Sequence, residues 1–223
     1  MALNLLMLGP PGAGKGTQSE RFARSRGIPK ISTGDILREA VHAGTGIGRR
    51  AKVVMDRGEL VGDDVMIGIV RERLEKTDAM GGFVLDGFPR TVAQAEALDD
   101  IMSTRDPLIV VDIVVPEAEL VRRLGTRLIC DTCGAGAPVA GAPAAACVRC
   151  GGRLVQRADD NQAVVIERLK VYHRQSEPLV EYYRVRPSFR SIDGAQPPDR
   201  VAADLAAAIE AASSGRGTVG ARG

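Results

Sequence analysis

The sequence predicts an α/β fold in which helices cover both faces of a parallel sheet. Short apolar segments of strand length lie at 3–8, 28–31, 82–85, 108–115 and 188–192. Longer segments with helical periodicity separate them, and such alternation is typical of parallel strands joined by right-handed crossovers. The segment 108–115 is the clearest strand, because its nearly continuous branched residues suit a strand that is covered on both faces.

A glycine-rich loop, Gly9–Thr17, directly follows the first predicted strand and precedes a helical segment at 18–26. Glycines let the backbone approach a ligand closely, so that successive N–H groups at a helix start can cradle phosphate. Lys15 would add a cation for the β- and γ-phosphates. The alternative is a plain turn, but the strand before the loop and the helix after it favour nucleotide phosphates. Gly16 stands where a hydroxyl often follows the lysine, and the hydroxyl comes one residue later, at Thr17.

Helix-start and helix-stop residues delimit the remaining elements. Gly27 can end the first helix, and Ser32–Asp35 supply hydroxyls and a carboxylate before the second. Asp159 is expected to cap a long helical stretch that breaks near Pro178, and residues 213–223 are expected to form a frayed tail. Helices are predicted at 18–26, 36–41, 45–58, 63–74, 91–102, 117–124, 159–178 and from 199 onward.

The third predicted strand, 82–85, runs directly into Asp86-Gly87-Phe88-Pro89-Arg90. Groups at the carboxyl ends of strands face the ligand crevice of an open α/β sheet. Asp86 therefore has two interpretations, a carboxylate near Mg²⁺ or a turn residue, and the residues alone do not choose between them.

Composition excludes several classes of protein. The 223 residues form either one α/β domain with insertions or two small domains. Basic and acidic side chains nearly balance, and aromatic residues make up only 3%, which disfavours binding to single-stranded nucleic acid. No apolar run approaches the roughly 18 residues of a membrane span. The first apolar stretch breaks at Gly9-Pro10, unlike a signal peptide, so we expect a cytosolic protein without disulfides.

The cysteines form two pairs, Cys130-x₂-Cys133 and Cys147-x₂-Cys150. This spacing is typical of a closed, structural Zn²⁺ site with four thiolates. The Ala-, Gly- and Pro-rich loop between the pairs could not build a core, so metal binding would supply folding energy. A redox dithiol pair and inert thiols are the alternatives. His42 and His173 lie far from this window and are expected at the surface or in packing.

Four motifs, taken together, resemble the adenylate kinases in order and spacing. They are Gly9–Thr17, Ile31–Asp35, Asp86–Arg90 and Arg157–Asp160. The likeness extends from about residue 1 to residue 210, and the long bacterial form with a zinc-bearing lid is the most similar.

The resemblance implies a P-loop core, a three-layer sandwich with a central parallel five-stranded sheet, formed by residues 1–31, 62–125 and 161–223. Residues 32–61 would be the segment that binds the nucleoside monophosphate (the NMP-binding segment), and 126–160 a lid with the zinc site. The implied reaction is ATP + AMP ⇌ 2 ADP with Mg²⁺. ATP, AMP and ADP would be the partners of a monomer that binds neither nucleic acid nor membranes.

The matched positions imply contacts with each nucleotide. The ATP contacts would be Gly12, Ala13, Gly14, Lys15, Gly16, Thr17, Arg123, Arg127 and the Gln196 backbone. The AMP contacts would be Thr33, Arg38, Glu59, Leu60, Val61, Gly87, Phe88, Pro89, Arg90, Gln94, Arg157 and Arg168.

Phosphoryl transfer spreads charge over oxygens, so positioning and neutralisation dominate its catalysis. A phosphate acceptor is already anionic and needs no general base. Guanidinium groups from several segments suit this chemistry. The expected catalytic residues are Lys15, Arg38, Asp86, Arg90, Arg127, Arg157 and Arg168.

The chain departs from the family in the loop between the cysteine pairs, which is short and rich in Ala, Gly and Pro. Gly136-Ala137 stands where relatives commonly have a polar–aromatic pair, so the resemblance does not extend to donor selectivity. A kinase for another nucleoside monophosphate, or one that uses GTP, is the first alternative, although Thr33 and Gln94 favour adenine. The second is a P-loop protein whose zinc ribbon binds nucleic acid, which the lack of aromatics in the cysteine window disfavours.

Overall fold

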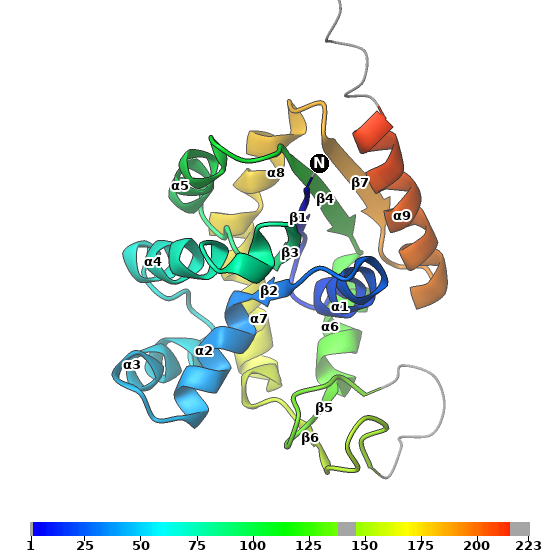
Figure 1. The fold of residues 1–223 in the computed structure, drawn as a ribbon. Coiled ribbons are helices and arrows are strands. Elements are labelled where there is room, and N and C mark those ends of the chain that lie inside the picture. The colour runs from blue at the N-terminus through cyan, green and yellow to red at the C-terminus, as the bar shows by residue number, and fades with distance from the viewer. Residues whose placement is uncertain (1, 138–145, 215–223) are drawn as a thin grey trace, which may run out of the picture.

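The computed structural model describes residues 2–137 and 146–214, and its centre is a five-stranded parallel sheet (Figure 1). The strand order is β2-β3-β1-β4-β7, and all neighbouring strands run parallel. This confirms the predicted α/β class with a five-stranded parallel sheet. The strands are β1 (Leu3–Leu8), β2 (Lys30–Ser32), β3 (Gly82–Asp86), β4 (Leu108–Val114) and β7 (Phe189–Asp193).

The sheet is covered on both faces because its strands alternate apolar side chains between two cores. In β1, Leu5 and Met7 belong to one buried cluster, whereas Leu6 and Leu8 belong to the other. The first cluster receives side chains from α1 (Lys15–Arg26), α6 (Glu117–Thr126), α7 (Gln162–Val171) and α9 (Pro198–Ser214). The second receives them from α2 (Thr33–His42), α3 (Gly46–Met55), α4 (Asp63–Leu74), α5 (Val92–Met102) and α8 (Pro178–Arg184).

Two excursions leave the sheet on the side where β1 ends (Figure 1). The helical pair α2–α3 follows β2 and returns to the core through α4. The antiparallel strands β5 (Leu128–Cys130) and β6 (Leu154–Gln156) follow α6 and carry the cysteine segment. The loop predicted between the cysteine pairs lies largely outside the described residues, since 138–145 are not described.

The long helical stretch near the C-terminus differs from its prediction in two places. Asn161 caps α7, accepting a hydrogen bond from the Val164 amide at 3.1 Å, so the predicted cap at Asp159 is wrong. Asp159 instead lies in a short 3₁₀ turn, Ala158–Asp160, and its carboxylate pairs with an arginine described below. After α7 the chain continues as a π-helix, η3 (Tyr172–Ser176), and Pro178 begins α8 rather than ending a helix.

A short 3₁₀ turn and the end of α9 complete the description of the fold. A 3₁₀ turn, Thr77–Ala79, precedes β3. At the C-terminal end, Ser213 and Ser214 still belong to α9, and each hydroxyl bonds to the carbonyl four residues earlier. The frayed tail predicted from residue 213 is therefore wrong for these two serines, and its remainder lies outside the described residues.

Gly82 tests how closely β1 and β3 pack. It has φ of +124°, and a Cβ there would lie 2.6 Å from the Leu3 carbonyl oxygen. We expect Gly82→Ala to lower the free energy of unfolding by about 2 kcal/mol or more, because strain and steric overlap add. Urea unfolding measures the change. The control is Gly81→Ala, whose Cβ meets nothing within 4 Å; equal stability of the two variants would contradict the argument.

Candidate functional site

The glycine-rich loop joins β1 to α1 at the carboxyl edge of the sheet. Gly9 has φ of +130°, and a Cβ there would lie 2.6 Å from the Ile113 carbonyl oxygen, so only glycine fits against β4. Gly14 caps α1 with φ of +92° and without any side-chain cap. The first amides of α1 are therefore left for a ligand, at the positive end of the helix dipole.

Lys15 reaches back over the loop. Its Nζ donates to the Gly9 and Pro10 carbonyl oxygens at 2.6 and 2.9 Å. Burial, together with the nearby charges of Arg90 and Arg168, lowers the pKa of Lys15 to about 8, although Asp86 opposes the shift. The Lys15 ammonium is thus held over the loop, where a bound anion would stabilise its charged form.

Two carboxylates lie beside this loop. The Asp86 Oδ2 is 3.4 Å from the position of a Cβ on Gly16, which places this carboxylate in contact distance of the loop. Asp112, on β4 opposite Leu8, is 5% exposed, and its Oδ1 has no hydrogen-bond partner among the described residues. Burial raises the pKa of Asp112, although Lys15 opposes the shift. Carboxylate oxygens such as these, and hydroxyls such as that of Thr17 on the loop, are the kinds of ligand that Mg²⁺ prefers.

The turn after β3 connects the loop to α2. The Gly87 carbonyl oxygen accepts from the Thr33 hydroxyl and from the Arg90 Nε, each at 2.8 Å. Burial and the charge of Arg168 lower the pKa of Arg90 to about 10, although Asp86 opposes the shift. Among the described residues no acceptor bonds to the Nη groups of Arg90, so both remain available to a phosphate.

Gln94 supports this turn from α5. Its Oε1 accepts from the Arg90 amide at 2.8 Å, and its Nε2 donates to the Asp63 carboxylate at 2.7 Å. Gln94 and Thr33 are each 1% exposed. Each end of the amide keeps one further hydrogen or lone pair, which is the capacity left for a base.

Asp160 gathers two of the predicted arginines. Its carboxylate, fully buried, forms a fork with Arg127 at 2.7 and 2.5 Å and accepts from Arg168 at 3.0 Å. Arg168 also pairs with Asp159 at 3.0 Å. These bonds hold Arg127, at the end of α6, beside Arg168 of α7 with their planes fixed.

Arg157 and Arg38 complete the cation cluster. Arg157 makes no ion pair with any described residue, and its buried Nε has no partner there. Burial and the charges of Arg38 and Arg127 lower the pKa of Arg157 to about 10. Arg38 is paired with Asp35, and although burial alone would raise the pKa of that carboxyl, Arg38 lowers it to about 2. The guanidinium of Arg157, like that of Arg90, is therefore without an ion-pair partner among the described residues and is available to an anion.

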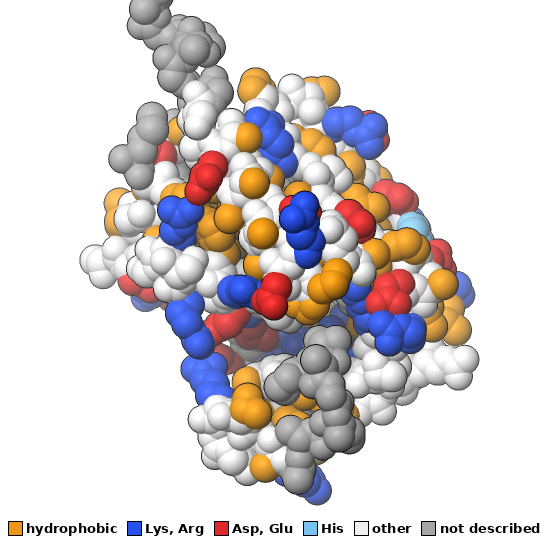
Figure 2. Space-filling model, turned by 90° about the vertical axis from the view of Figure 1, so that its right-hand side faces the viewer, with side chains coloured by type: hydrophobic (Ala, Val, Ile, Leu, Met, Phe, Trp, Pro, Cys, Tyr) orange, Lys and Arg blue, Asp and Glu red, His pale blue; other side chains and the backbone are white. Residues whose placement is uncertain are grey.

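The surface is hollowed between the main body and the cysteine segment, and basic and acidic side chains gather in the hollow (Figure 2). No helix in the described part of the chain has the length and apolarity to cross a membrane.

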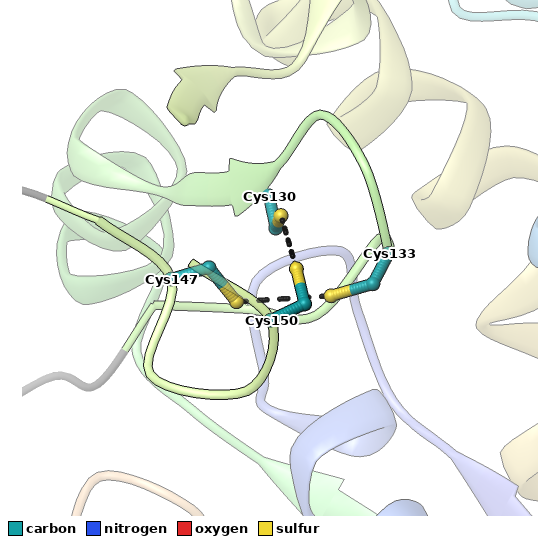
Figure 3. Close-up of side chains that lie close together, drawn as sticks. All are labelled: Cys130, Cys133, Cys147 and Cys150. Atoms are coloured by element: carbon teal, nitrogen blue, oxygen red, sulfur yellow. Dashed lines mark hydrogen bonds between the residues drawn. The ribbon is translucent and has the colours of Figure 1, made fainter. Parts of the chain in front are cut away.

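The four cysteine sulfurs converge from two similar turns (Figure 3). All lie within 4.8 Å of one another; Cys130 and Cys150 are 3.4 Å apart, and Cys133 and Cys147 are 3.7 Å apart. Tetrahedral thiolate sites with bonds of about 2.3 Å have sulfurs separated by about 3.8 Å. The amides of Thr132 and Arg149 each donate to a cysteine sulfur at 3.4 Å, which favours thiolates. The set fits a metal ion.

Comparison with known proteins identifies the family. The family model described as adenylate kinase matches residues 7–187. The chain belongs to the adenylate kinase family. It is 49% identical over 213 residues to an adenylate kinase from Archaeoglobus fulgidus, covering 93% of this chain and 98% of that protein. An adenylate kinase from Geobacillus sp. is 50% identical over 208 residues (91% and 96%), and one from Moorella thermoacetica is 52% identical over 199 (87% and 92%).

The residues predicted from the adenylate kinase motifs lie in different surroundings. Phe88 and Pro89 are buried, Phe88 in the core cluster that α4 and α5 share, so only their backbone faces a crevice. Arg123 is held by Glu119 at 2.7 Å and by the Gly194 carbonyl oxygen at 2.9 Å. The side-chain amide of Gln196 donates to the Asp193 carbonyl oxygen and to the Asp204 carboxylate. The predicted ATP contact involves the Gln196 backbone and not this side chain.

The connector Glu59–Val61 lies between α3 and α4 and approaches α7. Glu59 and Leu60 line a hollow of about 260 Å³ together with residues of α7 and η3. Just before it, a Cβ on Gly58 would lie 3.0 Å from the Arg168 Cγ. The connector is therefore close to the arginine cluster. Both histidines, His42 and His173, are exposed, as predicted.

Sequence reasoning missed the carboxylates that hold the arginines in place. Asp160 and Asp35 orient Arg127, Arg168 and Arg38, and Asp63 anchors Gln94. Asp160 closes the motif Arg157–Asp160, so a search for the acidic partners of motif arginines could have found it. Asp63 carries no comparable signal, because an acidic residue in a first helical turn is common.

Lys15→Met tests the loop. Methionine keeps the length of the side chain and removes its charge, so we expect the fold to persist and kcat for phosphoryl transfer to fall by about 100-fold or more. A coupled ADP assay and circular dichroism measure the two effects. The control is Lys76→Met, since Lys76 is exposed between α4 and the next 3₁₀ turn and has one distant carboxylate partner; near-normal turnover by Lys15→Met would refute the assignment of the loop.

Cys147→Ser tests the thiolate cluster. We expect loss of bound metal and about 2 kcal/mol of stability, roughly 4–8 °C in Tm for a chain of this size, because one ligand is removed. Mass spectrometry of the metal content and calorimetry measure this. The control is Val148→Ala in the same turn, where the side chain is 77% exposed. An unchanged Tm with full metal content in Cys147→Ser would rule out a structural metal.

Proposed function

We propose that the chain is a nucleoside monophosphate kinase that catalyses ATP + AMP ⇌ 2 ADP. The observation that supports this most is the convergence of Lys15 with arginines from four separate segments. They come from α2, the turn after β3, the cysteine segment and α7, and burial or neighbouring like charge lowers the pKa of several of them. Membership of the adenylate kinase family supports the same reaction.

The two nucleotides are assigned to the two sides of Lys15. ATP phosphates would bind the loop 12–17, with Arg123, Arg127 and the Gln196 backbone towards its nucleoside. AMP would bind in the crevice beside the turn 87–90, with its phosphate on the free Nη groups of Arg90 and its base towards Gln94 and the connector 59–61. Arg38, Arg157 and Arg168 would contact the phosphates between them.

The transfer itself needs no general base. An oxygen of the AMP phosphate attacks the γ-phosphorus of ATP, and the bond from that phosphorus to the β–γ bridging oxygen breaks, leaving ADP on both sides. The reacting oxygens are already anionic, so the chain's role is to align them and to neutralise charge on the transferred group. Lys15 and the guanidinium groups would do both.

Two metal ions accompany the proposal. Mg²⁺ would be held near Asp86 and Thr17, which offer oxygen ligands beside the loop, and when bound it would neutralise phosphate charge. Zn²⁺ would occupy the cluster of Cys130, Cys133, Cys147 and Cys150. Four thiolates leave no open position, so this site would be structural and would hold the lid together.

The core would comprise 1–31, 62–125 and 161–223, the NMP-binding segment 32–61 and the lid 126–160. Closure of the lid over the cleft would exclude water and prevent hydrolysis of ATP, as lids of adenylate kinases are known to do. We further propose a cytosolic monomer that binds neither nucleic acid nor membranes.

Turnover with AMP, UMP, CMP and GMP as acceptors, each with ATP, tests the function. We expect kcat/KM for AMP to exceed the others by about tenfold or more, because polar groups built for one base are left unpaired by another. GTP in place of ATP tests donor selectivity in the same assay. A better acceptor than AMP would overturn the proposal. A gel shift that weakens with salt would instead support the nucleic-acid alternative.

A further inference from the structure

The π-helix between α7 and α8 stands out in the fold. Tyr172–Ser176 is π-helical, and the Glu177 amide donates to the Tyr172 carbonyl oxygen, five residues earlier, at 2.9 Å. π-Helical turns are rare, and they occur often at functional sites. The segment continues directly from α7, the helix that carries Arg168, and it ends at Ser176.

Ser176 contacts the turn that holds Arg90. Its hydroxyl donates to the Arg90 carbonyl oxygen at 2.8 Å, across 86 residues of sequence. Serine hydroxyls in helices most often bond to a carbonyl of their own helix, as Ser25 does with Phe22 at 2.8 Å. Ser176 instead bonds to another element.

This contact completes a set of bonds around Arg90. The amide on one side of its Cα donates to Gln94, the carbonyl on the other side accepts from Ser176, and the Nε donates to Gly87, all at 2.8 Å. Because these bonds restrain both backbone groups and the Nε of Arg90, they also restrain the orientation of its guanidinium plane. The two Nη groups, which no described residue accepts from, then face a common ligand.

The three bonds come from different parts of the chain. Gln94 and Gly87 are close to Arg90 in sequence and belong to the same turn and helix. Ser176 belongs to the π-helix that continues from α7, so its bond ties the position of Arg90 to the helix of Arg168. The charges of Arg90 and Arg168 repel, and the Ser176 bond fixes the separation between the turn of Arg90 and the helix that carries Arg168.

We propose that Ser176 is a positioning residue for the acceptor phosphate. It fixes the Arg90 carbonyl, and through it the guanidinium that binds the monophosphate. The inference rests on the proposed function, since it assumes AMP on the side of Arg90. The donor site on the loop 12–17 does not depend on this bond, so loss of the hydroxyl affects the two substrates unequally.

Ser176→Ala, Ser176→Thr and the control Ser25→Ala test the proposal in steady-state assays with each substrate varied. We expect Ser176→Ala to lower kcat/KM for AMP about five- to tenfold, as loss of one hydrogen bond does, with KM for ATP within about twofold of wild type. Ser176→Thr keeps the hydroxyl and is expected to restore most of the loss. Ser25→Ala is expected to match wild type.

A purely structural role for Ser176 predicts equal effects on ATP and AMP together with a lower Tm, and that outcome would overturn the proposal. So would wild-type kcat/KM for AMP in Ser176→Ala, or a Thr variant as impaired as the Ala variant. If Ser176→Ala does not fold, Ser176→Cys, a near-isosteric weak donor, is expected to show the same unequal loss. Wild-type protein that makes no ADP from ATP and AMP would overturn the proposed function itself, whatever the variants do.

Discussion

The site depends on holding several cations close together in a partly buried cleft. Burial and mutual repulsion lower the pKa of Arg90, Arg157 and Arg168. Without counter-charges such a cluster would spread apart. The buried carboxylate of Asp160, with Asp159, neutralises Arg127 and Arg168, whereas Arg90 and Arg157 pair with no carboxylate in the described chain. Their unsatisfied charge is what phosphates would neutralise.

The parallel sheet makes this arrangement possible. It ends β1 and β3 side by side, with Met7 opposite Asp86, so the glycine-rich loop and the turn of Arg90 begin at neighbouring points of one edge. Both strands are buried on two faces, which makes their ends rigid. The cations from α2, the cysteine segment and α7 then approach this rigid edge from outside. A rigid sheet edge, with the cation-bearing segments around it, suits a reaction that needs alignment of its reactants and exclusion of water.

Much of the fold could be predicted because its signals are local. Apolar runs of strand length identified the sheet, and the loop Gly9–Thr17 and the cysteine pairs were recognisable from spacing. The helix boundaries were predicted less well where tertiary contacts decide them. Asp159 resembles a helix cap by its type and place, but the charge of Arg168 draws it into an ion pair, and Asn161 takes the cap. The π-helix carries no sequence signal that we recognise.

Sequence alone determined which residue types are present for phosphate chemistry, and their order, because glycine spacing, lysine and motif arginines are local patterns. It also determined the pairing of cysteines into two similar turns. Tertiary structure decided which arginines are free and which are paired, since Asp160 and Ser176 reach their arginine partners across distant elements, as Gln94 reaches Asp63. Packing between distant elements brings these groups within hydrogen-bonding distance, and for that reason no local sequence pattern predicts the contacts.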